Sequence, residues 1–124
     1  MKKFSKALLF FCAVLIFNSL PAFAHVFLKH ADPKVGSDIT AAPTEVKIWF
    51  TDEFDPSGTT VQVFNSGGKE IDLKDDRQDK ADPTLLIVSV PELAPGTYLV
   101  RWQGLCLEGH HTEGSYKFTI EGAK

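Results

Sequence analysis

Hydrophobic residues recur at every second position in several short segments of the chain, which is the periodicity of β-strands. In segment 45–51 (EVKIWFT), the side chains of Val46, Ile48 and Phe50 share one face. The same alternation predicts further strands at 59–64, 97–103 and 115–120. Short apolar segments predict two more, one that opens at 26–28 and ends at the turn residues 32–36, and one at 85–90. Glycine and proline punctuate the chain, and no window carries a useful helical period. The sequence therefore predicts an all-β sandwich or barrel of about seven strands.

Three connections between these segments support a sandwich. The cluster at 65–68 (NSGG) is typical of a hairpin turn. The charge-rich segment 74–82 (KDDRQDKAD) is predicted to be a solvated loop. Segment 95–98 (PGTY) resembles the tyrosine corner of immunoglobulin-like sandwiches, in which a phenol hydroxyl hydrogen-bonds across a strand connection.

The first 24 residues have the features of a secretory signal peptide. Three lysines precede an unbroken apolar run at 7–17, and segment 22–24 (AFA) supplies the small residues of a cleavage site. The run is about half of the ~20 residues that span a bilayer as a helix, so a retained membrane anchor is the weaker alternative. We expect cleavage of 1–24 after Ala24, export to the periplasm, and a mature domain at 25–124 that does not insert into the membrane.

Removing this segment changes the composition of the remaining chain. The segment holds three of the 13 basic residues and none of the 16 acidic ones, so the mature chain has a net charge of −6. That balance gives no attraction to nucleic acid. Met1 and Cys12 are lost as well, which leaves Cys106 as the one cysteine of an exported domain. An internal disulfide is thereby excluded, and stability has to come from packing.

The candidate chemistry lies in the histidines, because the chain has no sequence motif of a hydrolase nucleophile, a phosphate loop, a dinucleotide site or a paired-cysteine zinc site. Cleavage after Ala24 makes His25 the first residue. An N-terminal histidine offers its α-amine and its ring Nδ1 to one metal ion, provided that the amine loses its proton. The alternative is that cleavage leaves a histidine first by chance.

A second group of donors lies at Glu108-Gly109-His110. In an extended backbone, residues two apart point to the same face, with about 6.5–7 Å between their Cα atoms. The carboxylate and the imidazole are therefore expected to converge on one ion, which makes this group the candidate partner of His25. The alternative is a polar hairpin at the surface.

Three further donors have less defined roles. Cys106 is either a small buried hydrophobe or a thiolate ligand that would favour Cu(I). His111 either faces solvent or serves as an auxiliary ligand. His30 is predicted to lie at the surface.

Together these residues resemble the CopC family of periplasmic copper-binding proteins. The opening 24–28 (AHVFL), followed by Asp32-Pro33 and Gly36, is similar to the start of the family, and the closing motif of the family is matched by Glu108-Gly109-His110 with Gly114 and Phe118. Between them, 42–51, 95–98 and 100–102 look like the second and penultimate strands of the family.

The resemblance implies an immunoglobulin-like Greek-key β-sandwich that binds one Cu(II) per chain. It places His25 (amine and ring) and His110 in the ligand shell, with Glu108 at the position of the family's aspartate. Glu108 is one methylene longer than aspartate, so its oxygen is expected to sit differently. The mature chain also lacks the methionines of the Cu(I) loop that some members carry.

The sequence therefore indicates a periplasmic Cu(II)-binding protein, not an enzyme, that sequesters copper or delivers it to a membrane copper-handling protein. Two alternatives remain. A histidine brace also holds copper in lytic polysaccharide monooxygenases, so a small copper monooxygenase is one. The other is a metal-free sandwich that serves in adhesion or assembly.

Overall fold

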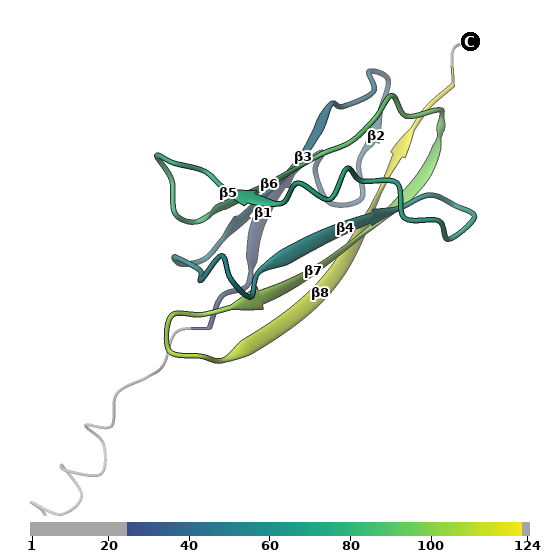
Figure 1. The fold of residues 1–124 in the computed structure, drawn as a ribbon. Helices are drawn as coiled ribbons and strands as arrows, with labels where there is room; N and C mark the ends of the chain where they lie inside the picture. The colour runs from purple at the N-terminus through teal and green to yellow at the C-terminus, as the bar shows by residue number, and fades with distance from the viewer. Residues whose placement is uncertain (1–24, 123–124) are drawn as a thin grey trace, which may run out of the picture.

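The computed structural model describes residues 25–122, and every regular element in this range is a β-strand (Figure 1). The strands are β1 (Leu28–Asp32), β2 (Asp38–Ile39), β3 (Glu45–Phe50), β4 (Thr60–Phe64), β5 (Arg77–Gln78), β6 (Leu85–Ser89), β7 (Gly96–Leu105) and β8 (His111–Ile120). Within these residues there is no helix long and apolar enough to cross a membrane. The predicted signal peptide, 1–24, lies outside the described residues.

The strands form two four-stranded sheets that lie one over the other (Figure 1). Sheet A has the order β1-β3-β6-β5, and sheet B has the order β2-β8-β7-β4. All neighbours are antiparallel except β2, which runs parallel to the end of β8. This is the strand arrangement of an immunoglobulin-like Greek-key sandwich. The predicted fold class is therefore confirmed.

Two details of the strand prediction are wrong. Segment 74–82 was expected to be a loop throughout, but β5 lies within it and pairs with β6. The first strand was expected to open at Val26 and to end at Asp32-Pro33, whereas β1 begins at Leu28; its end at Asp32 agrees with the prediction. Both β2 and β5 have only two residues, so neither is long enough to show a hydrophobic period.

The core lies between the sheets and is built from the alternating faces of the long strands. Val46, Ile48 and Phe50 of β3 are buried, as predicted. The residues that share one face along β4, β7 and β8 are buried too: Val61, Val63, Tyr98, Val100, Trp102, Tyr116, Phe118 and Ile120. The Phe50 and Trp102 rings, from opposite sheets, meet edge to face with centroids 5.4 Å apart. This contact lies near the end of the sandwich that carries the candidate site.

The predicted tyrosine corner is present. Tyr98, near the start of β7, donates a hydrogen bond from its hydroxyl to the backbone oxygen of Ala94 at 2.6 Å. Its ring stacks on Phe118 of β8 with centroids 5.4 Å apart. The corner fixes the connection from β6 to β7 and so helps to set the start of the hairpin that ends at the candidate site.

Three carboxylates, at Asp75 and Asp76 in the charged segment 74–82 and at Asp72 just before it, support strand edges. Asp72 and Asp76 accept hydrogen bonds from two backbone N–H groups of edge strand β4, at 2.9 and 2.8 Å. Asp75 accepts one from the Ser89 N–H of β6 at 2.7 Å. Hydrogen bonds from Ser89 hold the pKa of Asp75 below its usual value. These three carboxylates therefore replace backbone partners that a longer strand would supply.

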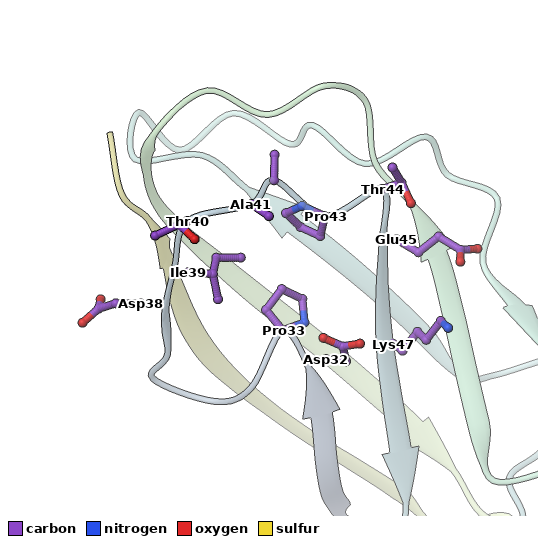
Figure 2. A pocket seen from close by; sticks show the side chains of 11 residues that line it. Asp32, Pro33, Asp38, Ile39, Thr40, Ala41, Pro43, Thr44, Glu45 and Lys47 are labelled. Atoms are coloured by element: carbon purple, nitrogen blue, oxygen red, sulfur yellow. The ribbon is translucent and has the colours of Figure 1, made fainter. Parts of the chain in front are cut away.

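The two ends of the sandwich differ in chemistry. One end has a hollow of about 630 Å³ between the end of β1, the β2 region and the start of β3. Its lining carries Asp32, Asp38, Glu45 and Lys47, with no histidine or cysteine (Figure 2). The histidines of interest lie at the opposite end, where β1 begins and β7 turns into β8.

Candidate metal centre

The structure brings together the rings of His25 and His110, which are far apart in the sequence. Their centroids are 4.9 Å apart, and the ring planes meet at 62°. His25 is partly exposed and His110 is exposed, so solvent reaches both. Metals bind imidazole nitrogen at about 2.0–2.1 Å, which places the centroids of two rings on one ion roughly 4–6 Å apart. The separation of the pair is therefore compatible with a shared metal ion.

His25 holds its position because the next residue is anchored in the core. Val26 is 0% exposed, and its backbone oxygen accepts a 2.5 Å hydrogen bond from the Thr112 hydroxyl of β8. Gly104 of β7 faces this segment, and a Cβ there would lie 2.8 Å from Cγ2 of Val26. The close approach requires a residue without a side chain. Thus sheet B fixes the chain one residue after His25.

Sheet A holds the same segment through Thr51, the residue after β3. The Thr51 hydroxyl donates to the His25 oxygen at 3.3 Å and accepts from the Phe27 N–H at 3.1 Å. The Thr51 N–H donates to the Phe27 oxygen at 2.8 Å. We call residues 25–27 the N-terminal segment. It is held by both sheets before β1 begins.

His110 is positioned by the turn that joins β7 to β8. The Gly109 N–H donates to the Cys106 oxygen, and the Cys106 N–H donates to the His110 oxygen, both at 3.0 Å. The His110 N–H donates to Sγ of Cys106 at 3.2 Å. Cys106 is 2% exposed and belongs to the core cluster, which favours its reading as a small buried hydrophobe. The contact between thiol and His110 backbone has no signal in the sequence.

The extended backbone expected for Glu108-Gly109-His110 is wrong. Residues 107–109 form the turn, and Gly109 has a φ of +91°, in the left-handed region that favours glycine. Glu108 is exposed on this turn. Within 25–122 no group of three or more His, Cys, Asp or Glu side chains is placed to hold a metal ion. Glu108 is thus not gathered with the two histidines, and its role as a ligand stays a prediction.

The other two histidines lie elsewhere. His30 is exposed and stacks on Trp49 with centroids 4.4 Å apart and planes at 19°, which confirms the predicted surface position. His111 begins β8 and is exposed. It lines a small hollow on the outer face of sheet B with Gln103, Thr112 and Glu113.

Two exposed apolar side chains lie in the segments that carry the histidine pair. Phe27 is 53% exposed, and its ring centroid lies 6.2 Å from that of His25. Leu107 is 58% exposed and lies in the turn that carries His110. Single exposed hydrophobic residues are common, but these two lie in the two segments that carry the histidine pair.

Comparisons with proteins of solved structure support the fold and the family. CopC from Methylosinus trichosporium OB3b is 31% identical to this chain, with a TM-score of 0.74 over 81% of this chain and 97% of that one. PcoC from Escherichia coli, described as a methionine-rich copper resistance protein, is 23% identical, with a TM-score of 0.68 over 79% of this chain and 100% of that one. The second match bears on the fold alone.

Curated relatives and a family model extend this result. Protein YobA of Escherichia coli (strain K12) is 28% identical over 99 residues, which make up 79% of this chain and 80% of YobA. The copper transport protein CutJ of Bacillus subtilis (strain 168) is 25% identical over 107 residues, which make up 86% of this chain but 20% of CutJ. The model of the CopC domain matches residues 28–121. This match spans well over half of the chain, which therefore belongs to the CopC domain family.

Proposed function

We propose that this protein binds copper as Cu(II) at the end of the sandwich where His25 and His110 meet. The observation that carries the proposal is the 4.9 Å separation of the two imidazole rings. A relative adds chemical support, since CutJ is named a copper transport protein. According to this proposal, the protein is a copper carrier and not an enzyme.

The donor set fits Cu(II) better than other divalent ions. Processing after Ala24 frees the α-amine of His25, so that one residue supplies an amine and a ring nitrogen. His110 adds a second ring nitrogen, and Glu108 supplies a carboxylate if its side chain turns toward the pair. Nitrogen-rich sets with an added oxygen favour tetragonal Cu(II), which also binds most tightly among the first-row divalent ions. We propose one Cu(II) per chain.

The cellular role follows from where such a site is made. A terminal histidine exists only after signal cleavage, so binding is proposed for the exported, periplasmic protein. There it sequesters copper or hands it to a membrane copper-handling protein. The exposed side chains of Phe27 and Leu107 beside the pair offer that partner an apolar contact.

The test compares the mature chain, starting at His25, with a form that carries one glycine before His25. Cu(II) affinity is measured by competition with a chelator, and the ligands are counted by electron paramagnetic resonance. The mature chain should bind one Cu(II) with an axial, nitrogen-rich spectrum. The extended form and His110→Ala should each bind more weakly, with altered spectra.

His30→Ala is the matched control, because it removes an exposed imidazole that stacks on Trp49 away from the pair. It should leave affinity and spectrum unchanged. Equal affinity of the mature and extended forms would show that the terminal amine is not a ligand. Oxidised oligosaccharides formed from chitin or cellulose with ascorbate would instead support the monooxygenase alternative. No change in tryptophan fluorescence or melting temperature with copper would support the metal-free one.

A further inference from the structure

We propose a second, weaker site for a borderline divalent cation on the outer face of sheet B, formed by His111 and Glu113 of β8 with Gln103 of β7. Unlike residues 107–109, this part of the chain is regular strand from His111 onward. Exposure alternates along it, with His111, Glu113 and Ser115 exposed and the residues between them partly buried. His111 and Glu113 therefore share the outer face, with about 6.5–7 Å between their Cα atoms.

The neighbouring strand supplies a third donor. Gln103 lies directly opposite Glu113 in the antiparallel register, and it is exposed on the same face. Side chains directly opposite have Cβ atoms about 4.5–5.5 Å apart. His111, Glu113 and Gln103 line one hollow of about 370 Å³, together with Thr112. An imidazole, a carboxylate and an amide oxygen thus border the same small volume.

These donors are not engaged within residues 25–122. The two ion pairs found there both belong to Arg77, and no side-chain hydrogen bond involves His111, Glu113 or Gln103. The next cation along β7, Arg101, lies over the ring of Phe64 at 5.4 Å from its centroid. The carboxylate of Glu113 is therefore free to bind an ion from solvent.

The chemistry of the set points to Cu(II) or Zn(II). Imidazole with oxygen donors suits borderline ions, whereas Mg²⁺ and Ca²⁺ prefer oxygen alone. The site has one imidazole nitrogen, against the ring and amine nitrogens proposed for the His25–His110 pair, so it should bind more weakly and exchange faster. Because His111 follows His110 directly, the weaker site would take up copper beside the tighter site and load that site. Only that loading role rests on the proposed function.

The experiment titrates the mature chain with Cu(II) beyond one equivalent, using calorimetry and electron paramagnetic resonance. The wild type should show two binding events with distinct spectra. His111→Ala should abolish the weaker event and Glu113→Gln should weaken it, while both leave the tighter event unchanged. His30→Ala is the control for a non-specific surface imidazole and should leave both events intact.

Two results would overturn the second site: a single event in the wild type, or a second event that survives in His111→Ala. The His110→Ala variant separates this proposal from the first one. It should lose the tighter event and keep the weaker one. If the wild type lacks a tight event but shows a weak one that disappears in His111→Ala, the proposed function fails and the second site stands.

Discussion

Thr112→Val tests whether anchoring of the N-terminal segment prepares the copper site. The substitution keeps the branched shape of the side chain and removes the hydroxyl that donates to the Val26 oxygen at 2.5 Å. Val26 is 0% exposed, so water cannot easily replace the lost donor. The hydrogen bonds of Thr51 to the segment, at 3.1 and 3.3 Å, remain.

The size of the effect follows from the buried carbonyl. Leaving a buried acceptor unsatisfied costs about 1–3 kcal/mol, and we take ~1.5 kcal/mol for this half-buried pair. If this cost destabilises the anchored conformation of the N-terminal segment, the fraction of molecules with His25 beside His110 decreases. The apparent Kd rises in inverse proportion to that fraction. Since 1.4 kcal/mol corresponds to a factor of ten, the Kd for Cu(II) should rise by up to about tenfold.

The assay is chelator competition on the mature chain, combined with hydrogen exchange of the Phe27 amide. Thr119→Val, the same substitution on the same strand, is the matched control. It removes a contact of 3.0 Å with the Thr97 hydroxyl at the other end of the sandwich. Thr119→Val should leave the Kd and the exchange of Phe27 unchanged. A Kd for Thr112→Val within twofold of the wild type, with unchanged exchange, would refute the anchoring argument.

Three further predictions concern the fold. Tyr98→Phe removes the corner hydrogen bond and should lower the free energy of unfolding by about 1 kcal/mol in urea titrations, whereas Tyr116→Phe should not lower it, because that buried hydroxyl has no partner within the described residues. Gly114→Ala places a Cβ 2.6 Å from Cζ2 of Trp102 and should destabilise by about 1–3 kcal/mol, with a changed near-ultraviolet dichroism of that ring; a wild-type melting temperature would contradict this. Hydrogen bonds from Ser89 of β6 lower the pKa of Asp75 below its usual value of 3.8. The contribution of Asp75 to the free energy of unfolding is therefore complete above that pH, and it is lost as the pH falls through the folded pKa. Asp75→Asn should therefore flatten the fall in stability below pH ~4, and an unchanged slope would argue against this role.

Most strands that the sequence predicts are those whose burial produces alternation, whereas β6 was predicted as a short apolar run and is buried at four of its five residues. β3, β4, β7 and β8 each have one face in the core, so period two is visible in their residues. β2 and β5 depend on pairing with β8 and β6, and two residues carry no period of their own. Pattern analysis therefore identifies the layers of the fold but not their short edge strands.

The candidate site was predicted only in part, for a similar reason. The resemblance to CopC proteins led to the expectation that His25 lies near His110, and the two rings are close. The extended geometry of Glu108 was wrong because the chain must reverse between β7 and β8, and Gly109 allows the left-handed turn residue. Two features depend on tertiary contacts and leave no local signal. These are the anchoring of Val26 and the hydrogen bond from the His110 N–H to Cys106.

The position of the histidine pair couples copper binding to the stability of the sandwich. The N-terminal segment is hydrogen-bonded to Thr51, which follows β3 of sheet A, and to Thr112 in β8 of sheet B. An ion held by His25 and His110 would add a link from this segment to the β7–β8 turn. A ligand at a free concentration one hundred times its Kd stabilises the folded state by about 2.7 kcal/mol, provided that it does not bind the unfolded chain. Copper should therefore slow hydrogen exchange of the Phe27 amide most of all, since that amide is held by the threonine that also binds the His25 carbonyl.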